Sequence, residues 1–374
     1  MDKLYKISFK KQTFDNNIKK IITNYKNNNK DILEGRLIFF DFLRIISSFS
    51  IIILHVSAKL FYKLNINSYN WKISFYINGL SRFAVPNFFM ISGALFLNKD
   101  ISFKNMYRKY IKRLFIVLYF WSLIYSISDI YFTKKGFKMI IIKCLFPHFH
   151  LWYLITTIGL YTITPFLREI VKNEKILNYY LLFSLIYTFI FPNLIHFLSF
   201  YSNILFYALN SFYIKLSLNY IKGYTFYFIF GFYLLKKFKG NNYKRILFYC
   251  FGLFGILFTT KFAHKILILK KKKSLIYFSH FQLNILFYSS SIFVFFKENF
   301  NHFKLANIQR VSKLTFGIYL IHPLIIKSIF QTKKIFSENF SPYDIPFISL
   351  IIFLLSLIIS FLIKLVPLFG KYLI

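Results

Sequence analysis

Long apolar stretches alternate with short polar or basic stretches from residue 37 to the end of the chain. A stretch of about 20 apolar residues is long enough to cross the hydrocarbon core of a membrane as a helix. The pattern therefore predicts an all-α, polytopic membrane bundle of about ten helices. The expected spans are 37–57, 75–97, 114–132, 150–167, 177–192, 224–236, 245–261, 280–296, 314–331 and 346–367.

One stretch leaves the number of spans open. Residues 193–222 are apolar but are interrupted by Asn203, Asn210 and Asn219. They form either an outer loop with surface-lying helices or an eleventh span. The sixth span, 224–236, is short and could take in residues from this stretch.

Composition agrees with the apolar pattern. Hydrophobic residues make up 57% of the chain and aromatic residues 23%, and the mean hydropathy is +0.51. Ordinary soluble domains contain about 45–50% apolar residues. We interpret residues 1–35 as a basic cytoplasmic tail, without the apolar core of a cleavable signal peptide. Residues 36–374 are interpreted as one transmembrane domain, with little room for a separate soluble domain.

The formal net charge is +37, a value that would ordinarily indicate nucleic acid or anionic lipid as a partner. Lys, Asn, Ile, Phe and Tyr are all abundant, and an A+T-rich genome is a sufficient cause for the surplus of lysine. We therefore expect membrane lipid around the bundle but no nucleic-acid partner. No metal site is expected either. Cys144 and Cys250 are far apart, and the eight histidines show neither an H-x3-H nor an HExxH pattern.

The position of the charges predicts the orientation. A basic loop between the second and third predicted spans contains Lys99, Lys104, Arg108, Lys109, Lys112 and Arg113. Basic loops favour the cytoplasmic side, so both termini are expected in the cytoplasm and His55 toward the outer leaflet. Residues 270–273, all lysines on the predicted outer side, disagree with this topology.

The first predicted span carries ionisable residues where a membrane helix normally has none. Uncompensated charge in hydrocarbon costs roughly 3 kcal/mol or more, so such residues are functional candidates. Asp41 lies three residues before Arg44, a spacing that allows an ion pair on one helix face. Arg44 and His55 share that face and lie about 16 Å apart along the axis. The stripe is either functional, or a buried pair that fixes helix register together with an interfacial histidine.

Arg44 followed by ten residues and His55, with Asp41-Phe42-Leu43 before it, resembles the first-helix motif of the acyltransferase-3 family. Other stretches agree with the family in type and order, and the resemblance covers nearly the whole chain after residue 35. They are 85–93 (VPNFFMISG), 107–113 (YRKYIKR), 150–153 (HLWY) and 319–323 (YLIHP). The family comprises bacterial integral-membrane acyltransferases that modify surface sugars and lipids.

The resemblance implies a role for the first-helix residues. His55 becomes the catalytic histidine, and an unperturbed imidazole is suited to general-base work near neutral pH. Sequence leaves open whether His55 activates the acceptor hydroxyl or carries the acyl group itself. Asp41 and Arg44 match the motif, and we expect them to shape the donor tunnel.

The same resemblance implies an acyl-CoA donor, which is anionic and cytoplasmic. Arg108 and Arg113 are the candidates for binding its phosphates, because guanidinium groups hold phosphate by paired hydrogen bonds. Family members often show a tighter arginine grouping here, whereas Lys109 and Lys112 accompany these two arginines. The alternative is that the arginines only determine topology. No permanently bound cofactor is expected, since acetyl-CoA or another acyl-CoA is a substrate.

Residues on the acceptor side are Arg82, Trp152, Tyr153 and His322. Arg82 either binds the acceptor or snorkels to the membrane surface. Trp152 and Tyr153 could equally form part of an interfacial aromatic belt. For His322 we favour a structural hydrogen bond to a neighbouring helix over proton transfer. The remaining histidines, His148, His196, His264, His280 and His302, are interpreted as ordinary interfacial residues.

The predicted function is that of a multi-pass O-acyltransferase of the bacterial cytoplasmic membrane, with O-acetyl transfer as the first choice. It would move the acyl group from cytoplasmic acyl-CoA to a hydroxyl of a surface polysaccharide or lipid-linked glycan of the cell envelope. The alternative, from another functional class, is a non-catalytic exporter or flippase of such glycans. A single polar stripe that ends in one histidine suits a reaction centre better than a continuous path.

Overall fold

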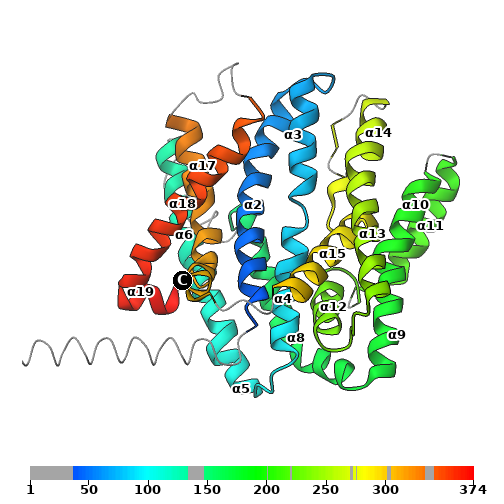
Figure 1. The fold of residues 1–374 in the computed structure, drawn as a ribbon, viewed down its shortest axis with the longest axis horizontal. Coiled ribbons are helices and arrows are strands. Elements are labelled where there is room, and N and C mark those ends of the chain that lie inside the picture. Colours follow the sequence, from blue (N-terminus) through cyan, green and yellow to red (C-terminus); the bar gives the residue numbers. More distant parts are fainter. Residues whose placement is uncertain are drawn as a thin grey trace, which may run out of the picture.

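A computed structural model describes residues 37–133, 147–199, 201–219, 221–269, 273–274, 276–300, 305–332 and 341–374. The predicted tail 1–35, Cys144 and His302 lie outside these ranges. Throughout the described residues the secondary structure is helical, without strands. The fold is therefore the predicted all-α bundle (Figure 1).

The helices follow one another through short connections. Their bounds are α2 (Phe39–Lys63), α3 (Tyr69–Leu80), α4 (Ala84–Phe96), α5 (Phe103–Asn105), α6 (Lys112–Thr133), α8 (Trp152–Lys172), α9 (Glu174–Leu185), α10 (Phe191–Leu198), α11 (Asn203–Lys215), α12 (Tyr224–Lys236), α13 (Asn242–Leu257), α14 (Ala263–Leu269), α15 (Leu283–Asn299), α16 (Ala306–Ser312), α17 (Thr315–Thr332), α18 (Asp344–Leu365) and α19 (Pro367–Tyr372). Short π-helical segments join α5 to α6, α9 to α10 and α13 to α14, and a 3-10 turn, Phe149–Leu151, leads into α8.

By length and composition, six continuous helices of the described chain could cross a membrane. They are Phe39–Lys63, Phe103–Tyr131, Phe149–Lys172, Glu174–Leu198, Asn242–Leu269 and Asp344–Leu365. The pair Ala306–Ser312 and Thr315–Phe330, bent by 51°, would make a seventh. Such helices are those of a membrane protein.

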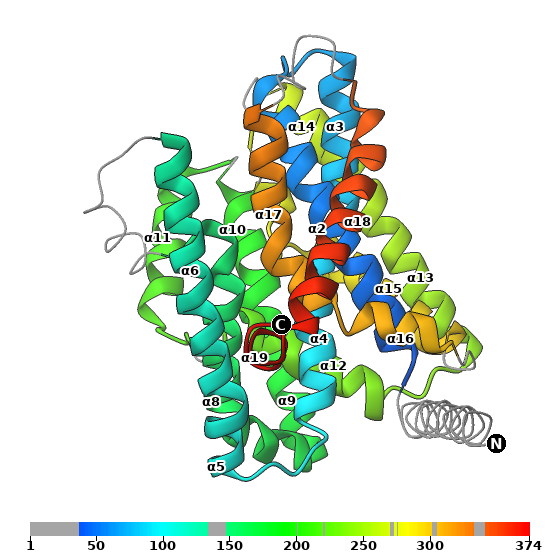
Figure 2. The same cartoon turned by 90° about the vertical axis from the view of Figure 1, so that its left-hand side faces the viewer.

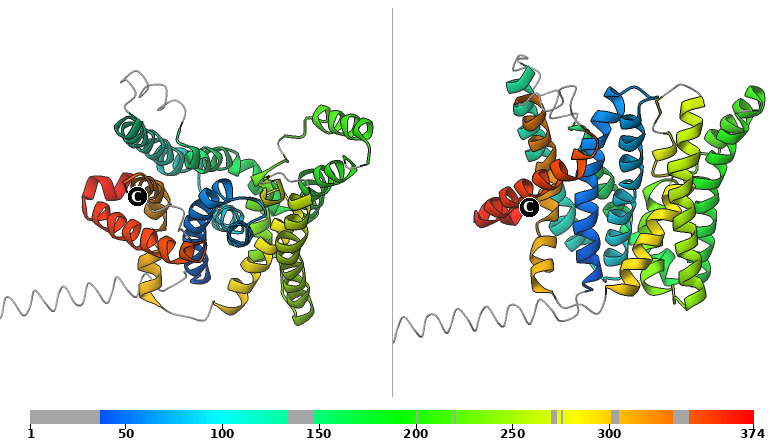
Figure 3. Two further views of the ribbon diagram at one scale, coloured as in Figure 1. Left: turned by 90° about the horizontal axis from the view of Figure 1, so that it is seen from above. Right: turned by 45° about the horizontal axis from the view of Figure 1, so that its top comes forward.

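All ten predicted spans fall on helical structure, but three of them are short or broken. The second is divided at Ser81 into α3 and α4, which have 12 and 13 residues. The sixth is α12 with 13 residues, and the eighth is α15 with 17. In the ambiguous stretch 193–222, α10 extends the fifth span to Leu198, and α11 is a 13-residue helix that packs against α10. Seen from above, α10 and α11 lie at one edge of the bundle and α18 and α19 at the opposite edge (Figure 3).

Glycine allows α4 and α12 to approach closely at the centre of the bundle. A Cβ atom on Gly93 would lie 1.7 Å from the backbone oxygen of Phe228, and one on Gly231 would lie 2.0 Å from that of Met90. Small residues permit this kind of contact between membrane helices. The packing role expected of the Ser92-Gly93 pair is thus confirmed for Gly93.

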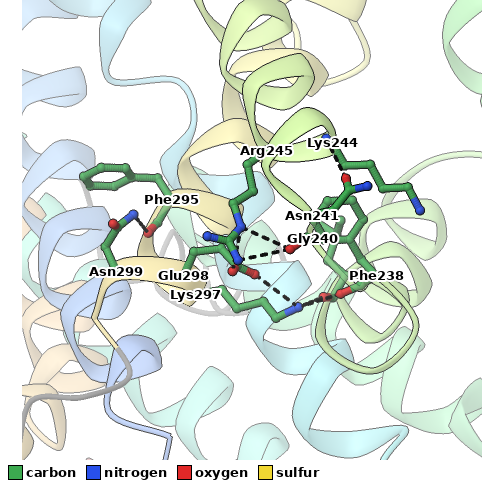
Figure 4. A network of polar contacts seen from close by, with 10 residues as sticks. Phe238, Gly240, Asn241, Lys244, Arg245, Phe295, Lys297, Glu298 and Asn299 are labelled. Atoms are coloured by element: carbon green, nitrogen blue, oxygen red, sulfur yellow. Dashed lines mark hydrogen bonds and ion pairs between the residues drawn. The ribbon is translucent and has the colours of Figure 1, made fainter.

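A closed group of charges joins the C-terminal end of α15 to the N-terminal end of α13 (Figure 4). We call Arg245, Lys297 and Glu298 the α13–α15 cluster. Arg245 Nε lies 3.1 Å from Glu298 Oε2, and Lys297 Nζ donates to the backbone oxygens of Leu234 and Phe238 at 2.8 and 2.9 Å. The charges of this cluster therefore meet protein acceptors and hold helix ends together.

Candidate active site

The polar stripe of α2 starts with the predicted ion pair. Arg44 Nη1 lies 3.3 Å from Asp41 Oδ1, which confirms the pair. Asp41 is fully buried, and its Oδ1 also accepts a hydrogen bond of 2.6 Å from Ser312 Oγ at the end of α16. The carboxylate therefore holds α2 to α16 and orients the guanidinium of Arg44, whose side chain is 24% exposed.

A cavity of about 630 Å³ extends along this stripe. At the N-terminal ends of α2, α6 and α17 its lining contains Arg44, Arg113 and Lys313, which we call the cavity cluster. Toward the other end, His55 and Arg82 line it. Among the described residues of the lining there is no Asp or Glu. The cavity thus joins a cationic end to His55, over the roughly 16 Å between Arg44 and His55.

The two arginines predicted on the donor side differ in position. Arg113 lines the cavity, donates to the backbone oxygen of Ile374, and holds its guanidinium 5.9 Å from the centre of the Phe316 ring. Arg108 is exposed on the π-helical segment Met106–Ile111 and is not part of the lining. Lys313 takes a place at this end that sequence reasoning missed. It lies at the bend between α16 and α17, which the hydropathy pattern did not reveal.

Aromatic and imidazole rings surround His55. The His322 ring is stacked on it at a centroid distance of 5.4 Å and an angle of 27°, and the Phe149 ring meets it edge-on, also at 5.4 Å. The centroid of His150 is 6.0 Å from that of His322. His148, interpreted from sequence as an interfacial residue, belongs to the same group, because its Nδ1 atom is 2.8 Å from Nδ1 of His150. Three separated motifs thus converge on one imidazole group.

His322 is fixed by its own helix. Its Nδ1 lies 3.0 Å from the backbone oxygen of Ile318, to which it donates. The structural hydrogen bond that we expected to a neighbouring helix is therefore made within α17. Because Nδ1 is the donor, the neutral ring carries no proton on Nε2. His322 consequently presents a fixed imidazole face to His55.

Arg82 lies at the break between α3 and α4. Its Nε and Nη2 donate to Asn78 Oδ1 at 3.1 and 2.7 Å, and Asn78 Nδ2 donates to the backbone oxygen of Leu54 at 3.0 Å. Asn78 thus ties the guanidinium of Arg82 to the residue before His55. Arg82 is half-buried and lines the cavity, so its charge is directed at the site.

Trp152 and Tyr153 also line the cavity and are half-buried. Trp152 is stacked on His280, with ring centres 6.1 Å apart. The Nδ1 atom of His280 lies 2.7 Å from the hydroxyl of Tyr224. His280 is therefore a wall residue of the cavity, although its position before the eighth predicted span suggested only an interfacial residue. In the part of the chain that the structure describes, no group of three or more His, Cys, Asp or Glu could hold a metal ion.

Comparisons with known proteins bear on this site. The Acyl_transf_3 family model, an acyltransferase domain, matches residues 37–365. Probable poly-beta-1,6-N-acetyl-D-glucosamine export proteins of Staphylococcus aureus strains MSSA476 and MRSA252 are each 26% identical over 312 residues, 80% of this chain and 85% of the relative. A protein of the same description from Staphylococcus epidermidis is 31% identical over 123 residues, 32% of this chain and 33% of the relative. No solved structure matches the chain.

Proposed function

The chain belongs to the acyltransferase-3 family, and from this premise we propose that it transfers an acyl group from acyl-CoA to a hydroxyl of a surface polysaccharide or lipid-linked glycan. Acetyl is the first choice of acyl group. The observation that carries the proposal is the cavity that joins Arg44, Arg113 and Lys313 to His55. A cationic end suits the phosphates of a CoA donor, and a histidine at the other end suits proton transfer to and from the reacting groups.

In the proposed reaction His55 accepts the proton of the acceptor hydroxyl. The hydroxyl oxygen then forms a bond to the thioester carbonyl carbon, and the carbon–sulfur bond breaks. His55 returns the proton to the departing thiolate, which leaves as the thiol of CoA. Negative charge develops on the carbonyl oxygen during this step, and Arg82, at the same end of the cavity, is placed to stabilise it.

His322 and Asp41 serve this reaction as positioning residues. The stacking of His322 restricts the ring of His55, and Asp41 orients Arg44. Trp152 and Tyr153 form apolar wall between the two ends. They exclude water from the thioester arm of the donor, which favours transfer to the sugar over hydrolysis.

The reaction needs an orientation. We place the cationic end in the cytoplasm, with about ten spans in the bacterial cytoplasmic membrane and both termini inside. The C-terminal end of α2, near His55, then faces outward. Labelling of a cysteine in the 98–113 loop from outside intact cells would contradict this orientation.

The relatives' printed names favour a second candidate function. They are described as probable exporters of poly-beta-1,6-N-acetyl-D-glucosamine, so this protein could move a glycan across the membrane without modifying it. The two candidates share a class of ligand but differ in what His55 does. In an exporter, substitution of His55 would change how much glycan reaches the surface and leave its acylation unchanged.

The test uses purified protein, radiolabelled acetyl-CoA, and surface glycan extracted from cells that lack the gene and freed of O-acyl groups by mild alkali. We expect wild-type protein to transfer label to the glycan and His55→Ala to lower the rate by about 10²- to 10⁴-fold, the usual cost of losing a positioned base. His264→Ala is the matched control, because His264 packs among Trp71, Phe75 and Tyr76 on α14 and lines neither end of the cavity. A near wild-type rate in His55→Ala would overturn the catalytic assignment.

A further inference from the structure

A second cavity, of about 360 Å³, lies beside the first. Its lining comes from the C-terminal parts of α2, α6 and α17 and from the segment before α8, and in Figure 2 these helix ends lie at the upper end of the molecule. His55 is the one described residue that lines both cavities. The imidazole of His55 is therefore the wall between a cavity with a cationic end and a cavity near the opposite face.

The chemistry of the second lining differs from that of the first. Lys327 Nζ lies 2.6 Å from Asp129 Oδ1, and the two side chains are only 17% and 21% exposed. Phe149 and Tyr62 add aromatic rings, and Lys59 adds another ammonium group. The larger cavity offers cations without a carboxylate side chain among its described lining residues. The smaller one offers a carboxylate and ammonium groups together.

A carboxylate accepts hydrogen bonds and an ammonium group donates them, whereas a sugar hydroxyl does both. Aromatic rings supply apolar faces for the C–H surfaces of a pyranose, and small-molecule sites combine apolar walls with a few fixed polar groups. An ion pair within apolar helices is itself a functional-site candidate. Asp129 and Lys327 are on different helices, α6 and α17, so a ligand bound to both is held at a fixed distance from His55.

We propose that this second cavity is the acceptor subsite, where Asp129 and Lys327 bind the hydroxyl groups of the sugar unit that receives the acyl group. The inference rests on the proposed acyl transfer and specifies its acceptor side, which sequence reasoning placed at Arg82, Trp152, Tyr153 and His322. The sugar hydroxyl approaches His55 from this cavity, while the thioester approaches it from the larger one. Both substrates are then present together, and the acyl group moves directly from sulfur to oxygen with the proton transfers described above.

The experiment measures KM for the acceptor and KM for the donor separately, with the purified protein, acetyl-CoA and de-O-acylated surface glycan. Asp129→Asn and Lys327→Gln each remove a charge-assisted hydrogen bond to the sugar, so we expect acceptor KM to rise about 10-fold or more. Donor KM should change by less than about 2-fold, because neither residue lines the donor cavity. Glu169→Gln is the matched control, since it breaks an exposed pair of the same 2.6 Å length, Glu169 to Lys172.

A steric variant keeps the test decisive if a charge variant does not fold. Ala58 lines the second cavity from α2, and Ala58→Phe fills part of it without removing a polar group. We expect the same rise in acceptor KM. Unchanged acceptor KM in the folded variants, with active wild-type protein, would overturn the subsite. A rise in donor KM would overturn it too, by assigning the cavity to the donor. Inactive wild-type protein would instead contradict the proposed function, so the two failures are distinguishable.

Discussion

Basic side chains gather at two places near the N-terminal end of the α2 stripe, and these places differ in what faces the charges. In the α13–α15 cluster, Arg245 and Lys297 contact Glu298 and backbone oxygens, and the group closes on itself (Figure 4). In the cavity cluster, Arg44, Arg113 and Lys313 line about 630 Å³ of open volume. Charge density alone therefore does not identify a binding site. A cation that faces a cavity serves a ligand, whereas one enclosed by protein acceptors serves the fold.

The largest effect expected from this comparison comes from Asp41, the carboxylate that orients Arg44. Asp41→Asn keeps the shape of the side chain but removes the counter-charge from a fully buried position. Breaking a buried pair in this way costs about 3 kcal/mol or more in the free energy of unfolding. We expect lower yield and a lower melting temperature in detergent, and lower activity in addition.

The control for Asp41→Asn is Glu169→Gln, which breaks an exposed pair and should leave the melting temperature unchanged. Wild-type stability in Asp41→Asn would show that the buried pair does not stabilise the junction of α2 and α16. The distinction between the carboxylates of the two clusters would then lose its basis.

A smaller effect separates the arginines of the two clusters. Arg113→Gln should weaken acyl-CoA binding about 10- to 100-fold, because each charge-assisted hydrogen bond to phosphate contributes roughly 1.5–3 kcal/mol. Arg245→Gln, the same substitution in the α13–α15 cluster, should leave CoA binding unchanged. Isothermal titration of the purified variants measures both, and membrane orientation must be checked beside it.

Equal CoA affinity in Arg113→Gln and wild type would assign Arg113 to topology alone. Arg108→Gln extends the series. Arg108 is exposed and outside the cavity lining, so the structure supports a weaker effect than for Arg113. The role of Arg108 in binding CoA stays a prediction that this titration decides.

Local spacing and apolar pattern were enough to predict the helical bundle, the family and the Asp41–Arg44 pair. Residues three apart on a helix meet whatever the tertiary structure is, and a membrane span needs an apolar stretch. The family model confirms the resemblance drawn from the motifs. The number of spans was harder to predict, because α3, α4, α12 and α15 are short helices whose packing depends on neighbours such as the Gly93–Phe228 contact.

Sequence could not predict which distant residues share a wall. Lys313, His148 and His280 became visible only because helix bends and loops bring them to the cavity or to the imidazole group. Asp129 and Lys327 are 198 positions apart, so no local pattern links them. Residues at helix breaks and on separate helices are therefore the ones that sequence reasoning missed.

The smallest effect tests the α13–α15 cluster itself. Glu298→Gln removes the charge that Arg245 and Lys297 share, but both cations keep other partners. Arg245 still donates to the backbone oxygen of Gly240 at 3.2 and 3.0 Å, and Lys297 still donates to those of Leu234 and Phe238. We expect the free energy of unfolding to fall by about 1 kcal/mol, seen as a small shift of the melting curve. Acyl-transfer rate and CoA affinity should equal those of wild type, because the cluster faces no cavity that contains His55. A change in CoA affinity with an unchanged melting curve would mean that the α13–α15 cluster acts on the donor, and it would refute the division between enclosed and cavity-facing charges.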